Sequence, residues 1–361
     1  MKRTGPIKVL IVDDSPLIRS ILSRVLAEEP DIQVVGGAKD PYEARELIIT
    51  YRPDVIILDI EMPRMDGLTF LAKLMAHYPV PVIMCSGVAP ASSAAALKAI
   101  ELGAIDVVSK PTAGGNRALR RLGTDLAEKI QAAVLSMPSP PLIPASATSG
   151  LESFHAAGLD PNRYLVAIGA STGGTEAIRH VLANVPADCP PIVMVQHMPE
   201  GFTRSFADRL DQLSRITVKE AVDGDVLVPG KAFLARGGVQ MSVRISGGKW
   251  RIDYGTSELV NRHCPSVDVL FDSIARCQGR QFVGVLLTGM GADGAQGLLN
   301  LRHKGAITIA QDKRSSVVYG MPKVAVELGA VQHQSTPEEV ARVLMQSLRS
   351  KPKQSVVRHC G

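Results

Sequence analysis

A serine between glycines is the first residue whose surroundings could do chemistry. Residues 169–174 read GASTGG and follow the apolar run 165–168, so Ser171 stands in the G-x-S-x-G spacing of a nucleophile elbow. Such a turn, between a strand and a helix, lifts the hydroxyl above the strand end, and the glycines leave room for a substrate. The motif alone also fits a turn that holds a phosphate or one that only packs a helix against a sheet.

Two further polar residues could complete a nucleophilic site with Ser171. His197 directly follows the apolar run 192–196, and Asp293 follows the run 282–287 through a glycine-containing loop. If these strands are neighbours in a parallel sheet, all three side chains emerge at one edge. A nucleophile, a base and a carboxylate that orients the base form the arrangement used for acyl transfer. The chain order Ser, His, Asp disfavours an ordinary α/β-hydrolase, whose order is Ser, acid, His.

Each of these residues also has an ordinary structural interpretation. A lone histidine such as His197 is more often a surface or core residue, and Asp293 could cap the helix that follows it. Their joint placement with Ser171 favours the catalytic interpretation. The other histidines have no comparable setting in the sequence, namely His155, His180, His263, His303, His333 and His359.

A second set of polar residues lies in the first third of the chain. Each follows or ends an expected strand: Asp13, Asp14, Asp59, Ser86 and Lys110. Three carboxylates repel one another unless a cation lies among them, and their oxygens suit Mg²⁺. The lysine and the serine hydroxyl would neutralise and bind a phosphoryl group on Asp59. A helix cap could explain one of these aspartates, but not five converging positions.

The elements that position these residues alternate regularly. Strands are expected at 9–12, 32–36, 55–58, 82–85 and 105–108, with helices at 17–27, 42–50, 68–77, 91–102 and 119–135. Strand–helix alternation of this kind predicts a five-stranded, doubly wound parallel sheet over residues 1–135, with ligands at the carboxyl ends of its strands.

A second α/β domain is expected after a linker. Residues 136–159 are rich in proline, serine and alanine and predict an interdomain linker. Residues 160–349 resume the alternation, with strands at 165–168, 192–196, 282–287 and 306–310 and helices at 175–183, 202–213, 267–275, 292–304 and 337–348. Glycine turns within 226–254 predict β-hairpins inserted in a mostly parallel α/β fold. Residues 350–361 are expected to form a charged tail.

Composition excludes several classes of protein. No run of 18 apolar residues is present, so we expect no membrane insertion. The five cysteines are scattered without a C-x-x-C pair, which argues against a zinc site or a disulfide framework and favours the cytoplasm. A net charge of +5 with 4% aromatic residues, and no dense basic block, argues against nucleic-acid binding.

Residues 1–135 resemble a response-regulator receiver domain over their whole length. The match includes DIEMPRMDG at residues 59–67 and the pair Lys110-Pro111. This resemblance implies that Asp59 accepts a phosphoryl group from a histidine kinase, and that Asp13 and Asp14 hold Mg²⁺ together with it.

The same resemblance assigns three further positions, and a fourth departs from the family pattern. It implies that Glu61 offers a backbone carbonyl to the metal, and that Ser86 and Lys110 bind the phosphoryl oxygens. Many receivers carry an aromatic residue three positions before the lysine, which turns inward on activation. Here that position is Val107, so an aromatic switch is not assumed.

Residues 164 to about 330 resemble the catalytic domain of chemotaxis protein-glutamate methylesterases. The matching segments are AIGASTGGTEA at 167–177, QHMP at 196–199, TGMGADG at 288–294 and YGMP at 319–322. The resemblance implies a Ser171–His197–Asp293 triad, with oxyanion donors near Thr172 and Met290. It also implies hydrolysis of glutamate γ-methyl esters on methyl-accepting chemoreceptors, with glutamine deamidation in some members.

The expected protein is therefore a phosphorylation-regulated esterase. The receiver would inhibit the catalytic domain until Asp59 is phosphorylated, with Mg²⁺ as its cofactor, and ester hydrolysis would need none. We expect a monomer. The alternative is a receiver-regulated, non-catalytic module that binds a nucleotide or protein, although a full G-x-G-x-x-G with a following acid is missing. A transcription-factor output ranks lowest, because no helix-turn-helix with a basic recognition helix is visible.

Overall fold

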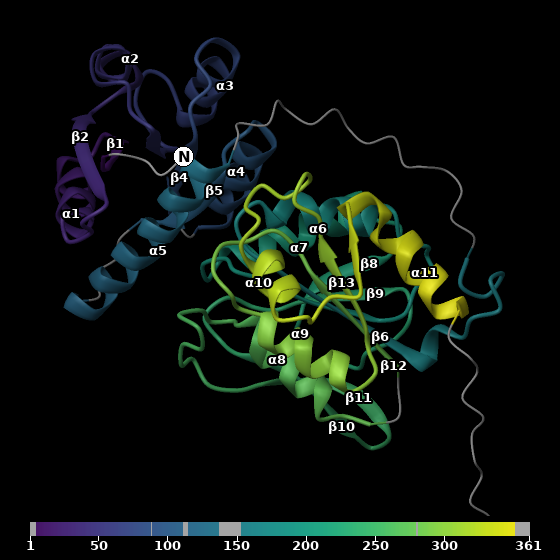
Figure 1. Cartoon of the computed structure of the whole chain (residues 1–361). Helices are drawn as coiled ribbons and strands as arrows, with labels where there is room; N and C mark the ends of the chain where they lie inside the picture. Colours follow the sequence, from purple (N-terminus) through teal and green to yellow (C-terminus); the bar gives the residue numbers. More distant parts are fainter. Residues whose placement is uncertain (1–4, 88, 111–114, 137–152, 279–280, 351–361) are drawn as a thin grey trace, which may run out of the picture.

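Two α/β units, each built on its own parallel sheet, make up the computed structural model (Figure 1). The structure describes residues 5–87, 89–110, 115–136, 153–278 and 281–350. Most of the predicted linker and nearly all of the predicted tail lie outside these residues. At the end of the linker segment, Phe154 is buried against the second unit, and its backbone N–H donates to Asp188 Oδ1 over 2.9 Å.

The first unit has the predicted five-stranded parallel sheet. Its strand order is β2-β1-β3-β4-β5, with β1 (Ile7–Val12), β2 (Ile32–Ala38), β3 (Val55–Asp59), β4 (Val82–Ser86) and β5 (Asp106–Ser109). Every residue of β3 and β4 is buried, as expected for strands that helices cover on both faces. Since all pairs are parallel, the five carboxyl ends meet at one edge.

Five helices flank this sheet. They are α1 (Pro16–Leu26), α2 (Pro41–Tyr51), α3 (Gly67–His77), α4 (Pro90–Glu101) and α5 (Gly115–Leu135). Short polar side chains set where three of them begin. Ser15, Asp40 and Asp66 each accept a hydrogen bond from a backbone N–H of the first turn, which satisfies donors that the helix itself leaves free.

The second unit is organised around a seven-stranded sheet. Its order is β14-β13-β12-β6-β7-β9-β8, and all of its pairs are parallel. The strands are β6 (Tyr164–Ala170), β7 (Ile192–Gln196), β8 (Thr217–Glu220), β9 (Lys231–Leu234), β12 (Gln281–Leu286), β13 (Ile307–Gln311) and β14 (His333–Ser335). Strands β12, β6 and β7 are neighbours, which is the condition for a shared site, so the segments that carry Ser171, His197 and Asp293 leave the sheet side by side.

The region 226–254 holds one hairpin. It joins β10 (Met241–Ser246) to β11 (Lys249–Tyr254). This pair confirms the predicted inserted β-hairpin region, whereas β9, from the same region, joins the main sheet in parallel with β7 and β8. A four-residue strand is too short to show which partner it pairs with.

Six α-helices and two short 3₁₀ turns complete the described part of the second unit. They are α6 (Gly174–Ala183), α7 (Phe202–Leu213), α8 (Val267–Ala275), α9 (Ala295–His303), α10 (Met321–Glu327), α11 (Val340–Ser350), η1 (Pro161–Arg163) and η2 (Pro337–Glu339). Among the described residues, none of the helices has the length and apolar character needed to cross a membrane.

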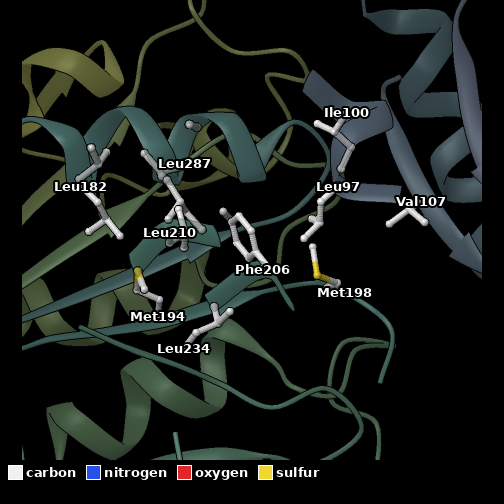
Figure 2. Close-up of a cluster of buried hydrophobic side chains, with 14 of the residues drawn as sticks. Leu97, Ile100, Val107, Leu182, Met194, Met198, Phe206, Leu210, Leu234 and Leu287 are labelled. Carbon is white, nitrogen blue, oxygen red and sulfur yellow. The ribbon is translucent and has the colours of Figure 1, made fainter. Parts of the chain in front are cut away.

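The two units pack on each other through an apolar cluster. Helix α4 of the first unit lies against α7 of the second. Figure 2 shows Leu97, Ile100 and Val107 of the first unit facing Met198 and Phe206 of the second. All five side chains are buried. Val107, where many receivers carry an aromatic residue, is therefore part of the contact between the units.

Candidate active site

Ser171 occupies the turn between β6 and α6, as its motif predicts. Its backbone N–H donates to the carbonyl of Thr288 over 3.0 Å, and its own carbonyl accepts from Gly174 over 2.6 Å. Gly173 has a φ of +76°, in the left-handed region that favours glycine. Across the turn, a Cβ on Gly289 would lie 2.7 Å from Ser171 Cβ, so only glycine fits there.

His197 leaves the sheet beside this turn. Ala170 pairs with Gln196 across β6 and β7, and the next residues along these two strands are Ser171 and His197. His197 Nε2 lies 2.8 Å from Asp293 Oδ2, while Nδ1 is buried without a hydrogen-bond partner in the part of the chain that the structure describes. Because the carboxylate accepts from Nε2–H, Nδ1 carries the free lone pair of the neutral ring. The nitrogen that could act as a base is thus available.

Asp293 is surrounded by donors. Besides His197, it accepts hydrogen bonds from Asn261 Nδ2 over 2.8 Å, Ser266 Oγ over 2.7 Å and the Val267 backbone N–H over 2.7 Å. Burial raises the pKa of this carboxyl, but the bonds from His197, Asn261 and Ser266 outweigh burial and hold the pKa well below its usual range. Asp293 is therefore a fixed anion that orients the imidazole.

The alternative role of Asp293, as a cap for the helix that follows it, is not what the structure shows. Helix α9 begins at Ala295 with Gly294 at its N-cap. The carboxylate reaches instead to the first turn of α8, where it accepts from the Val267 N–H. The positive end of the α8 dipole adds to the stabilisation of this anion.

His263, which has no comparable setting in the sequence, lies beside His197 in the structure. Its ring stacks on that of His197 with centroids 3.6 Å apart and an interplanar angle of 14°. Burial, with the nearby His197, lowers the pKa of His263 to about 3, so the ring is neutral near pH 7. His263, Asn261 and Ser266 all come from the loop between β11 and α8, which has no periodic pattern to reveal them.

The two expected oxyanion residues differ in their contacts. Thr172 Oγ1 donates to Asp106 Oδ2 over 2.8 Å, so the residue after Ser171 is bonded to the first unit. Met290 lies half-buried in the loop 289–291, which Gly320 and Met321 hold through backbone bonds to the Gly289 carbonyl. Their roles as oxyanion donors remain predictions.

The predicted acidic site forms at the carboxyl edge of the first sheet. Asp13, Asp14 and Asp59 offer oxygens that all lie within 4.8 Å of one another. Lys110 Nζ lies 2.7 Å from Asp59 Oδ2 and 3.2 Å from Asp13 Oδ2. Ser86 is buried at the end of β4, where its Oγ donates to the carbonyl of Ser92 over 3.2 Å.

Asp59 is deeply buried but has few hydrogen-bond donors to stabilise its charge. Burial raises its pKa to about 6, which the ion pair with Lys110 only partly offsets. Asp13 Oδ2 is likewise buried, and the charged group that faces it is the same Lys110 ammonium, 3.2 Å away. Three clustered carboxylates that share a single lysine fit the oxygen preference of Mg²⁺. The Glu61 side chain accepts from Ser92 Oγ over 2.7 Å, and the metal-binding role of its backbone carbonyl stays a prediction.

Polar contacts join the two units. Asp106 Oδ2 of the first unit accepts from Thr172, and within the first unit Asp106 Oδ1 lies 2.8 Å from Lys129 Nζ. Arg209 donates to Glu101 over 2.7 Å. A cleft of about 1440 Å³ opens between α5 and the catalytic loops, and His197 is among its lining residues.

A phosphoacceptor-type acidic site on one sheet and a serine–histidine–aspartate set on the next define a response regulator with an enzymatic output domain. Family models agree, since the CheB methylesterase model matches residues 166–344 and the response regulator receiver domain model matches residues 9–120. The chain belongs to the CheB family of receiver-linked methylesterases.

Named relatives place the chain in this family over most of its length. It is 51% identical to protein-glutamate methylesterase/protein-glutamine glutaminase 5 of Anaeromyxobacter dehalogenans, over 90% of this chain and 92% of the relative. It is 48% identical to the corresponding protein 2 of Pseudomonas aeruginosa, over 94% and 97%. The crystal structure of the Thermotoga maritima CheB methylesterase catalytic domain is 38% identical, covers 51% of this chain and 97% of its own, and gives a TM-score of 0.49. These names do not support the non-catalytic alternative.

Proposed function

We propose that this chain is a serine esterase that hydrolyses glutamate γ-methyl esters on methyl-accepting chemoreceptors, under the control of phosphorylation at Asp59. The observation that carries the proposal is the bond between Asp293 and His197 Nε2, which leaves Nδ1 without a partner among the described residues, while Ser171 and His197 follow paired residues of β6 and β7. The activities in the names of the relatives support the same conclusion.

The chemistry proceeds in two halves. Ser171 attacks the ester carbonyl while His197 Nδ1 takes its proton, and the anionic Asp293 stabilises the imidazolium. The imidazolium then protonates the leaving oxygen, and methanol departs from the acyl-enzyme. Water, activated by His197, releases the glutamate. Each backbone N–H aimed at the oxyanion, expected near Thr172 and Met290, contributes about 3 kcal/mol.

Glutamine deamidation follows from the same steps, with ammonia as the leaving group in place of methanol. The relatives carry glutaminase in their names. The amide is a poorer leaving group, so protonation by the His197 imidazolium matters more for this reaction than for the ester.

Phosphorylation is proposed at the acidic site, with a histidine kinase as donor. Asp13, Asp14 and Asp59, with the Glu61 carbonyl, would hold Mg²⁺, which supplies positive charge to the incoming phosphoryl group. Ser86 and Lys110 would bind its remaining oxygens. Asp59 Oδ2 already lies 2.7 Å from Lys110, so part of the neutralising charge is in place.

The receiver is proposed to restrict access to the esterase site at rest. Its Asp106 holds the hydroxyl of Thr172, next to the nucleophile, and its α5 lines the cleft in front of His197. A phosphoryl group on Asp59 can open this arrangement only through a difference in its interaction with the open and closed forms.

Methanol release from methylated receptor membranes tests the esterase. We expect Ser171→Ala and His197→Ala to lower the rate by about 10⁴-fold or more, because the triad acts as a unit. Ser246→Ala, in the β10–β11 hairpin, is the matched control and should keep the wild-type rate. Unchanged activity in Ser171→Ala would exclude the triad.

A shortened chain beginning at Asp160 tests the inhibition. Without the receiver it should release methanol faster than the unphosphorylated full chain, and acetyl phosphate should narrow the gap by activating the full chain. If the shortened chain is no faster, the receiver does not inhibit the esterase.

A further inference from the structure

A strained turn stands at the mouth of the cleft. Val260 and His263 exchange two backbone hydrogen bonds, of 3.0 and 2.9 Å, which closes a turn over Asn261 and Arg262. Both central residues have positive φ, +52° and +69°. A two-residue turn of this kind is usually built from Asn-Gly, because each non-glycine residue there costs about 1 kcal/mol or more.

The side chains of the two residues with positive φ lie in different surroundings. Asn261 donates to Asp293, which explains its place in the turn. Arg262 serves no such internal bond: its side chain is 71% exposed, and it lines the cleft alongside His197 and His263. An arginine held in a conformation that glycine adopts more easily, at the rim of the esterase site, indicates that its guanidinium has a task there.

In the structure, the guanidinium of Arg262 forms an ion pair with a carboxylate of the receiver. Arg262 Nη1 donates to Glu128 Oε1 over 3.0 Å, and the other oxygen of Glu128 lies 4.0 Å from His263 Nε2. Glu128 belongs to α5, whose Asp125, one turn earlier, also lines the cleft. The receiver thus presents two carboxylates of α5, those of Asp125 and Glu128, to the cleft, although Arg120 and Lys129 of the same helix also line it.

We propose that Arg262 binds a carboxylate of the substrate helix, one turn away from the ester, and that Glu128 holds the same place while the receiver is docked. The inference rests on the proposed esterase function and adds a substrate requirement: an acidic residue one helical turn from the methylated glutamate. Arginine suits this task because its planar fork matches a carboxylate and stays charged at any relevant pH.

A purely structural ion pair between the domains would behave differently. If Arg262 only fastened the receiver, its loss would free the site, as the loss of Glu128 would, and unphosphorylated activity would rise in both variants. If Arg262 binds substrate, its loss raises KM for an acidic substrate, whereas the loss of Glu128 removes a competitor. The two variants then change turnover of an acidic substrate in opposite directions.

The test uses the full chain with acetyl phosphate and Mg²⁺, and two helical peptides that each carry one glutamate γ-methyl ester. One peptide has glutamate four residues before and four residues after the ester, and the other has glutamine at both positions. We expect the wild type to favour the acidic peptide by about tenfold in kcat/KM, mainly through KM, as one charge-assisted contact allows.

Variants of Arg262 and Glu128 then test whether Arg262 causes the preference for the acidic peptide. Arg262→Gln and Arg262→Gly should remove the preference, and Arg262→Lys should retain part of it. Glycine relieves the positive φ, so a lower melting temperature cannot account for its loss of preference. Glu128→Gln should keep the preference and raise the unphosphorylated rate. Arg244→Gln, which breaks an exposed pair with Asp253 on the hairpin, is the control and should change neither value.

The outcomes separate the two proposals. Methanol release from neither peptide would overturn the esterase function and this inference with it. Release from both peptides at equal kcat/KM, or a preference that survives in Arg262→Gly, would overturn the inference alone. A rise in the unphosphorylated rate of Arg262→Gln on the acidic peptide, equal to that of Glu128→Gln, would show a fastening role only.

Discussion

The receiver and the catalytic domain each bury an aspartate at the carboxyl edge of a parallel sheet. The pKa values of these two carboxyl groups are shifted in opposite directions. Burial raises the pKa of Asp59 to about 6, whereas hydrogen bonds outweigh burial at Asp293 and hold its pKa well below the usual range. The difference lies in the donors: Asp59 has Lys110, and Asp293 has two side chains, a ring N–H and the first turn of α8.

In the proposed mechanism, this comparison separates an aspartate that accepts a phosphoryl group from one that orients a histidine. A carboxylate saturated by donors is stable as an anion but has few lone pairs left for bonding a new group. A carboxylate short of donors is costly to ionise, and its free oxygens remain available to a metal ion and a phosphoryl group. Two similar folds thus give a buried aspartate different chemical roles, because the number of hydrogen-bond donors around its carboxylate differs.

The largest expected effect concerns catalysis. Asp293→Asn should lower kcat for methanol release by about 10⁴-fold, since the amide no longer favours the tautomer with Nδ1 free. Asp59→Asn should instead remove the response to acetyl phosphate. Both are read in one assay of the full chain. A normal kcat in Asp293→Asn would show that the donor-rich aspartate is only structural.

Stability should respond with opposite signs. Asp293→Ala leaves the donors of Asn261, Ser266 and Val267 without a partner and should cost about 2–4 kcal/mol. Asp59→Asn removes a charge that burial penalises, so it should raise the melting temperature of the receiver by a few degrees at pH 7.5 in EDTA. Thermal melts followed by calorimetry measure both.

The pH dependence of the unfolding free energy gives a second test of these opposite stability changes. The folded pKa of Asp59 is raised, so the stability it contributes is present at low pH and lost as the pH rises through about 6. The gain from Asp59→Asn should therefore fade towards pH 4. For Asp293 the folded pKa is lowered, and its contribution is lost only as the pH falls below about 4. If Asp59→Asn raises the melting temperature by the same amount at pH 4, burial of an ionised Asp59 is not the cause of the gain.

The smallest expected effect concerns His263. Its pKa falls from 6.5 to about 3 on folding, so the unfolded chain binds more protons between these values. Stability of the catalytic domain should decrease as the pH falls through this window, by about 2 kcal/mol at pH 5. Urea titrations at pH 8 and pH 5 of the wild type and His263→Gln measure this, and the variant should show a flatter dependence.

Much of the architecture could be predicted, because parallel sheets follow simple rules. Alternating strands and helices predict the first sheet and four strands of the second, β6, β7, β12 and β13, and polar residues after buried runs predict where Asp59, Ser171 and His197 lie. Which strands are neighbours was left open by the sequence, and once the structure supplies that order, the shared carboxyl edge of parallel strands brings these side chains to two sites.

The residues that were missed lie where these rules do not apply. His263, Asn261 and Ser266 reach the site from an irregular loop, and a turn with two positive φ values has no hydrophobic period. The contact between Thr172 and Asp106 joins two domains, and no local pattern in the sequence encodes which faces of two domains meet. The three-residue β14 and the short α10 were too brief to predict.

Strand β5 has a consequence for how a signal crosses the molecule. It begins with Asp106, which holds Thr172, continues with Val107 in the apolar contact between the domains, and is followed at once by Lys110 on Asp59. Three residues lie between Asp106 and Lys110, about 13 Å of extended chain, so in the proposed regulation one strand carries both the lysine that binds the phosphoryl group and the aspartate that holds Thr172. Communication along one stiff peptide needs no relay of loops, and a single inserted residue within β5 should uncouple phosphate from turnover while leaving both sheets intact.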